Sequence, residues 1–77
     1  MNKNNVLDRY YLDCRCMLLE LAATLDRYDR ADLPTPGVKP VDERLLRLGR
    51  AIAILSQASA QPDRTQRILQ LLSDPAL

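Results

Sequence analysis

The 77-residue sequence contains no histidine, no tryptophan and no phenylalanine, and only two cysteines and two glycines. Without histidine, a Ser-His-Asp site is excluded, and two cysteines alone cannot supply the four ligands of a conventional structural zinc site. Two glycines are too few for a glycine-rich phosphate-binding loop. We therefore expect no enzyme activity, no catalytic residue, no bound metal and no cofactor.

The charge is nearly balanced, with eleven basic and ten acidic residues and a net charge of +1. Long-range electrostatics therefore gives no reason to expect nucleic acid or an anionic membrane as the main ligand. No run approaches the roughly 18 apolar residues of a membrane span. Two unpaired thiols and the lack of a secretory signal predict a cytoplasmic protein. Arginine and aspartate outnumber lysine and glutamate, which we take to indicate a GC-rich bacterial genome.

The length predicts a single helical domain over residues 1–77. A domain this small buries only roughly 60% of the surface of its unfolded chain, so it needs disulfides, a metal or oligomerisation to stabilise it. Cys14 and Cys16 lie about 200° apart around a helix and cannot bridge each other within it. Oligomerisation is the remaining possibility.

Proline divides the chain into helical segments, because it interrupts a helix wherever it falls in the interior. Residues 33–40 contain three prolines and a glycine and predict an interhelical loop, and Pro62 marks a second break. No segment shows the alternation of a strand. We expect an all-α protein with a disordered N-terminus at residues 1–4 and helices at about 5–31, 42–60 and 63–74.

Each expected helix begins with a capping side chain. Asn5, followed by Asp8 three residues later, resembles a capping box for the first helix. Asp42 and Asp63 are the caps expected for the second and third helices.

The strongest pattern is an apolar seam in the first helix, whose members recur in alternating steps of four and three residues, as in a coiled coil. The seam consists of Leu7, Tyr11, Cys14, Leu18, Leu21, Leu25 and Tyr28. The second helix has a row of apolar residues in matching steps. We therefore expect these two helices to form an antiparallel hairpin, with the third helix folded over one end.

A second stripe of apolar residues follows another side of the first helix: Leu12, Cys16, Leu19 and Ala23. A helix that is apolar most of the way round is buried on more than one face. Because the second helix covers only one face, we expect a partner on the other, either a second copy in a dimeric helical bundle or another helical protein. The expected interface combines the second stripe with the seam residues Leu7, Tyr11, Leu18, Leu25 and Tyr28.

A four-residue sequence, Leu-Asp-Arg-Tyr, occurs at residues 7–10 and again at 25–28, and the seam is nearly palindromic about Leu18. Two first helices packed antiparallel would then bring Asp8 of one chain near Arg27 of the other. Chance recurrence of four common residues is the alternative.

A row of small residues, Gly49, Ala53, Ser56 and Ala60, follows the second helix. It indicates either a close approach by another helix or a glycine tolerated on an exposed side.

Two further functions stay open beside a non-enzymatic interaction or adaptor module. Asp13 and Glu20, from each of two subunits, are candidate ligands of a carboxylate metal-binding bundle, although such sites normally include histidine. Arginines recur on the second and third helices and permit a helix-turn-helix DNA-binding regulator, with Arg64 and Arg67 as candidate base-reading residues.

Overall fold

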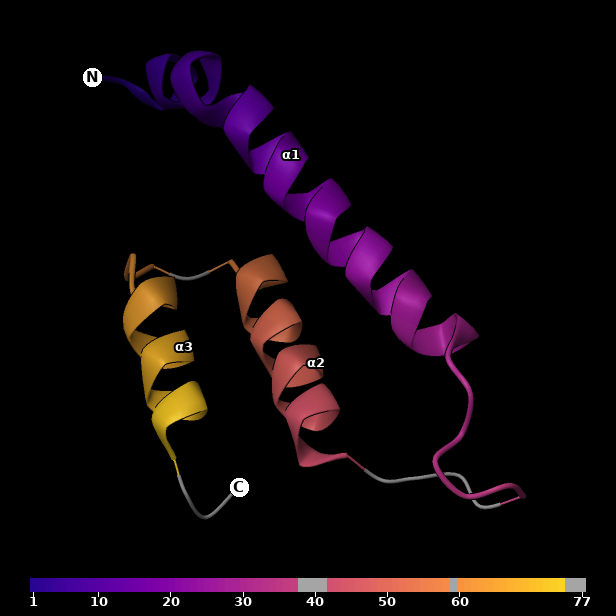
Figure 1. Ribbon diagram of the computed structural model, residues 1–77. Coiled ribbons are helices and arrows are strands. Elements are labelled where there is room, and N and C mark those ends of the chain that lie inside the picture. Colours follow the sequence, from indigo (N-terminus) through magenta and orange to yellow (C-terminus); the bar gives the residue numbers. More distant parts are fainter. Residues whose placement is uncertain (38–41, 59, 75–77) are drawn as a thin grey trace. The chain divides into compact units, whose positions relative to one another are not determined.

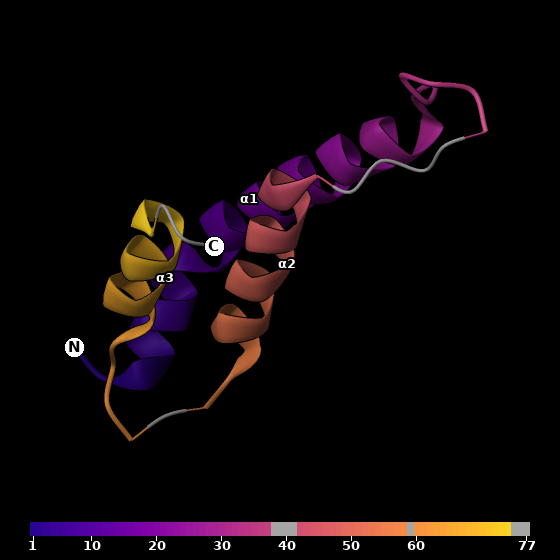
Figure 2. The ribbon, with the colours of Figure 1, turned by 90° about the horizontal axis from the view of Figure 1, so that it is seen from below.

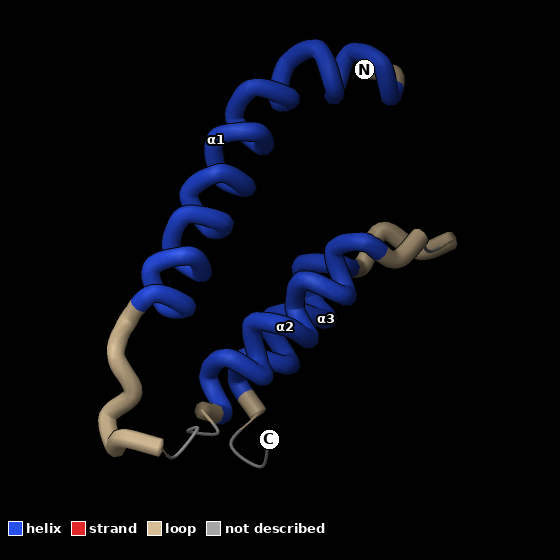
Figure 3. The backbone as a smooth tube through the Cα atoms, turned by 90° about the vertical axis from the view of Figure 1, so that its right-hand side faces the viewer, coloured by secondary structure: helices blue, strands red, loops and turns tan. Residues whose placement is uncertain are grey.

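The computed structural model describes residues 1–37, 42–58 and 60–74. All regular secondary structure in these ranges is helical, which confirms the all-α class (Figures 1 and 3). The helices are α1 (Lys3–Arg30), α2 (Glu43–Ser56) and α3 (Arg64–Ser73). The chain divides into two units, Met1–Val38 and Lys39–Leu77. Each unit is described by itself, so the hairpin of the first two helices stays a prediction.

The first unit begins with a reciprocal cap. The Oδ1 atom of Asn2 accepts a hydrogen bond from the Asn5 backbone N–H at 2.9 Å, and Asn5 Oδ1 accepts one from the Asn2 N–H at 3.1 Å. The expected start at Asn5 is therefore wrong by one half turn, because Asn5 occupies the third helical position of a capping box in place of the usual Glu or Gln. Residues 3 and 4, expected to be disordered, lie in the first turn of α1.

The other end of α1 agrees with the expected boundary to within a residue. The helix ends at Arg30, and the Ala31 N–H donates to the carbonyl groups of Arg27 and Tyr28 at 3.1 and 3.2 Å. The two arginines lie in the last turn, where positive charge suits the negative end of the helix dipole. In the loop that follows, Gly37 has a φ of +80°, a conformation that glycine adopts without strain. Residues 38–40 of the expected loop lie outside the described ranges.

α2 begins as expected and ends early. Asp42 is its N-cap and accepts a hydrogen bond from the Arg44 backbone N–H at 2.9 Å. The helix ends at Ser56, whereas the sequence predicted residue 60. The Ser56 hydroxyl donates to the Ala53 carbonyl at 2.9 Å, and the Gln57 N–H donates to the Ile54 carbonyl at 3.2 Å. These bonds satisfy carbonyl groups that a longer helix would have used, and the chain turns toward α3.

α3 begins one residue after Asp63, as expected, but the Asp63 carboxylate makes no capping hydrogen bond. Its Oδ1 atom is enclosed and has no hydrogen-bond partner in the described part of the chain. The residue's backbone N–H donates to the Gln61 carbonyl at 2.9 Å. The helix ends at Ser73, and the proline expected to stop it, Pro75, lies outside the described residues.

α2 and α3 lie side by side and antiparallel (Figures 1 and 2). Hydrogen bonds tie the start of α2 to the end of α3, and the end of α2 to the start of α3. No described residue is fully buried. The half-buried apolar side chains of this unit are Leu45, Ala51 and Ile54 from α2 and Ile68 and Leu71 from α3.

Candidate functional site

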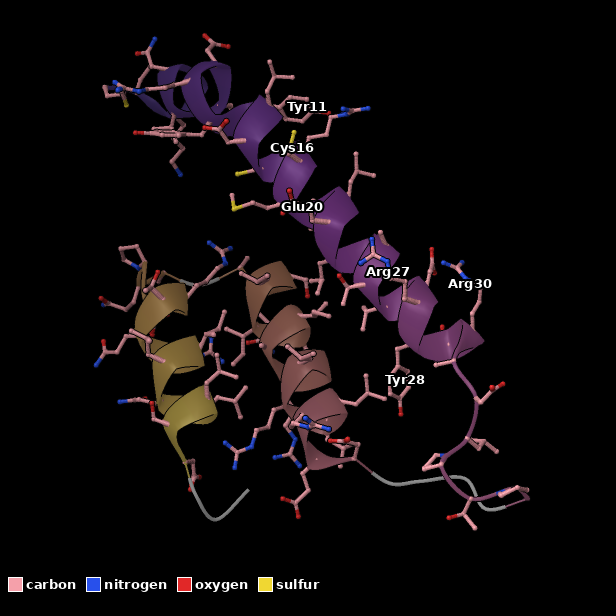
Figure 4. The ribbon with its side chains drawn as sticks, viewed as in Figure 1. Tyr11, Cys16, Glu20, Arg27, Tyr28 and Arg30 are labelled. Atoms are coloured by element: carbon pink, nitrogen blue, oxygen red, sulfur yellow. The ribbon has the colours of Figure 1, made fainter. Side chains whose placement is uncertain are left out.

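The seam of α1 is largely exposed. Leu7, Tyr11 and Leu18 keep 62, 61 and 63% of their surface accessible, and Leu21 and Leu25 are half-buried. Cys14 and Tyr28 are exposed as well. Figure 4 labels two of these side chains, Tyr11 and Tyr28, which extend from α1. The structure thus places the seam residues on one continuous helix but covers none of them completely.

The second stripe is at least as exposed to solvent as the seam. Leu12 is 70% exposed, the highest value among the large apolar side chains of the three described helices, and Leu19 is 54% exposed. Cys16 and Ala23 are exposed too. Most members of both expected faces are therefore exposed on α1.

Three further apolar side chains widen the seam, and the sequence analysis did not include them. Val6, Tyr10 and Met17 are 42, 44 and 59% exposed. Tyr10 and Met17 lie three or four residues from seam members and so border the seam on the helix surface, and Val6 lies four residues before Tyr10. That spacing is the signal that would have found them.

The polar groups of α1 make few contacts with one another. The Arg9 guanidinium lies 5.5 Å from the centre of the Tyr10 ring, within range of a cation–π interaction. The Thr24 hydroxyl donates to the Glu20 carbonyl at 2.9 Å. Both contacts are local, so neither covers the apolar faces.

Within the described ranges, the cysteines and carboxylates are not gathered into a metal site. Cys14 and Cys16 are free thiols. In the ranges that the structure describes, no group of three or more Cys, Asp or Glu side chains is arranged to hold a metal ion. The carboxylate bundle would draw Asp13 and Glu20 from two subunits, and it stays a prediction.

The candidate base-reading arginines contact α2. Arg64 Nη2 donates to the Gln57 backbone carbonyl at 2.8 Å, and Arg67 Nη2 donates to Gln57 Oε1 at 2.8 Å. Both guanidinium groups therefore stabilise the turn between α2 and α3, a role that no local pattern in the sequence indicates.

Two arginines of the row on α2 also form contacts within the second unit. Arg47 Nη1 and Nη2 donate to the carbonyl groups of Leu72 and Asp74 at 3.1 and 2.6 Å. Arg44 forms an ion pair with Asp42, with Nη2 and Oδ2 2.8 Å apart. This ion pair and the capping hydrogen bond lower the pKa of Asp42 from 3.8 to about 2, the side-chain hydrogen bond from Arg44 being the larger cause. Arg44 and Arg47 of this row thus form contacts within the second unit.

Gly49 does not mark a close helix contact within the described part of the chain. A Cβ atom built on Gly49 would meet no neighbouring atom within 4 Å. Among the described residues, the Gly49 position of the small-residue row therefore has space for a larger side chain.

Comparisons with known proteins add no assignment: no family model, no curated protein and no solved structure matches the chain. Among the described residues, no helix combines the length and the apolar character that crossing a bilayer requires. The apolar surface of α1 is the feature that carries functional inference.

Proposed function

We propose that this protein is a non-enzymatic helical interaction module that associates through α1, either with further copies of itself or as a small adaptor for another helical protein. The observation that carries the proposal is that α1, the longest helix with 28 residues, has no buried residue and is apolar on two faces. Cytoplasmic location belongs to the same proposal.

The physical argument concerns the stability of α1. An isolated helix is marginal in water, and most helical stability in proteins comes from packing an apolar face. Burying one large aliphatic side chain contributes about 1.5 to 3 kcal/mol. The seam and the second stripe together hold six leucines that are not fully buried. Association that covers them stabilises α1 and removes apolar surface from water.

The expected hairpin is part of this proposal. α2 presents Leu48, Ile52 and Leu55, which are 39, 38 and 49% exposed, on one side of the helix in steps of four and three. Packing this row on one face of α1 leaves the other face for a partner, and two such chains form a bundle with four long helices.

Sedimentation of the full chain over a range of micromolar concentrations tests the proposal. We expect oligomers that Leu18→Asp or Leu19→Asp weakens about a hundredfold or more, because each chain loses one buried leucine and gains a charge. Gln66→Asp is the control, since it places the same charge at an exposed position of α3, outside both apolar faces of α1, and should leave assembly unchanged within a few-fold. A monomer whose α1 amides are nevertheless protected from hydrogen exchange would overturn the proposal.

A further inference from the structure

We propose that the seam of α1 pairs with the seam of a second copy, parallel and in register, as a two-stranded coiled coil. This rests on the proposed function and deepens it by naming the partner and its orientation. Three observations carry it: the lengths of the helices, the heptad positions of the seam, and the charges beside it.

The lengths distinguish the two faces of α1. α2 has 14 residues and is about 21 Å long, whereas the seam from Leu7 to Tyr28 extends over about 32 Å. The second stripe, from Leu12 to Ala23, is only about 17 Å long and matches α2. Of the three described helices, only another α1, with 28 residues, is long enough to cover the whole seam.

One heptad position in line with the seam favours a parallel pair. One set of core positions, usually called a, is occupied by Tyr11, Leu18 and Leu25, and extending the repeat places Asn4 at the preceding a position. The structure includes Asn4 in the first turn of α1 and leaves it exposed. A polar asparagine at a single a position specifies register and oligomeric state in two-stranded coiled coils. In a parallel pair each of these residues meets its own copy.

The charges beside the seam favour the parallel orientation. In a parallel pair, a residue on one flank faces the residue five positions further along on the opposite flank of the partner. Lys3 then faces Asp8 of the second copy, which is an attraction that occurs twice. Tyr10 faces Arg15 in the same way, a pairing compatible with a cation–π contact.

The antiparallel orientation brings like charges together. It places equal flanks of the two helices against each other, so Asp8 faces Asp29 of the second copy, twice. The attraction suggested by the repeated tetrapeptide does not form, because Asp8 and Arg27 lie about 100° apart on opposite sides of the seam. The near-palindrome of the seam is therefore not the arrangement we propose.

The two cysteines allow a direct test. In the parallel pair, Cys14 faces Cys14 of the second copy across the seam, whereas Cys16 lies about 200° further round the helix. Both thiols are free and exposed in the chain. The experiment oxidises the full-length Cys16→Ser variant, which retains Cys14, at a concentration where sedimentation shows the oligomer. Cys14→Ser, which retains Cys16, is the matched control.

We expect most of the Cys16→Ser protein to migrate as a disulfide-linked dimer and the Cys14→Ser protein to remain monomeric on a non-reducing gel. Cross-linking that requires Leu21→Cys in addition to Cys14 would show an antiparallel pair and overturn the proposal. Cross-linking through Cys16 alone would place the second stripe in the interface and overturn it as well.

The experiment separates this proposal from the proposed function. A protein that stays monomeric at all concentrations, with α1 amides exchanging freely, would overturn self-pairing and leave the adaptor form of the function standing. A monomer with protected α1 amides would overturn both.

Discussion

At the scale of single residues, arginines of the second unit donate hydrogen bonds to backbone carbonyl groups. Arg47 satisfies two carbonyl groups at the end of α3, and Arg64 satisfies the carbonyl of Gln57 just beyond α2. The last carbonyl groups of a helix lack partners within the helix and carry partial negative charge, so a guanidinium group is well suited to them. These side chains stabilise the pair of helices without a fully buried core.

Arg47→Met should destabilise the second unit by about 1 to 2 kcal/mol. The variant keeps the aliphatic stem but loses two charge-assisted hydrogen bonds, whose full contribution is reduced by the partial exposure of the residue. Thermal unfolding followed by circular dichroism measures the loss. Arg50→Met, at an exposed position one turn further along α2, should change stability by no more than about 0.5 kcal/mol. Equal effects of the two variants would contradict the assigned role.

Acid should remove the contribution that Asp42 makes to the stability of the folded chain. Its pKa is lowered in the folded chain to about 2 from 3.8, so the stabilisation is complete above about pH 4 and is lost as the pH falls through about 2. Helicity of the wild-type chain should therefore decline between pH 4 and pH 2, and Asp42→Asn should flatten this part of the titration. Glu43→Gln makes the same change of charge one residue away and should leave the decline in place.

At the scale of the helices, their ends depend on contacts at different distances along the chain. Asn2 and Asn5 begin α1 through side chains three residues apart, and Asp42 begins α2 through a hydrogen bond two residues away. Such local caps can be predicted from sequence. Because asparagine occupies both positions of the capping box, however, α1 begins earlier than the sequence analysis expected. The end of α2 depends on Gln57, which accepts hydrogen bonds from arginines of α3, and no local pattern indicates that contact.

Gly49→Ala tests whether the small-residue row of α2 is an open surface. Alanine is favoured over glycine in a helix interior by about 1 kcal/mol, and the added Cβ meets nothing within 4 Å. The variant should raise the urea concentration at the midpoint of unfolding and leave the sedimentation coefficient unchanged. Weakened assembly would instead indicate that another helix packs closely on this row.

At the scale of the whole molecule, the two units differ in how they are stabilised. The second unit has two helices joined by hydrogen bonds and by half-buried apolar residues, including Ile54 and Leu71. The first unit has one long helix without a buried residue. If a partner covers α1, its stability depends on protein concentration, and that of α2 and α3 does not.

Dilution should therefore lower the stability of the first unit and leave that of the second unit unchanged. We expect hydrogen-exchange protection of α1 amides, such as those of Leu18 and Leu19, to fall about threefold for each tenfold dilution above the dissociation constant of a dimer, and to be lost below it. Protection of Leu71 in α3 should stay constant. Protection that falls equally in both units would show that they unfold as one. Protection of α1 that does not change on dilution would show that α1 is stabilised within its own chain.

The sequence by itself determined the helical class, the approximate positions of the three helices and the two apolar faces of α1. These follow from proline placement and from the spacing of residues such as Leu7, Leu18 and Leu19, which are properties of neighbouring positions on one helix. Only the tertiary structure decided the length of α2 and the roles of Arg47, Arg64 and Arg67. Those depend on carbonyl groups that folding brings close to side chains far away in the sequence. The spacing of neighbouring residues does not predict such contacts.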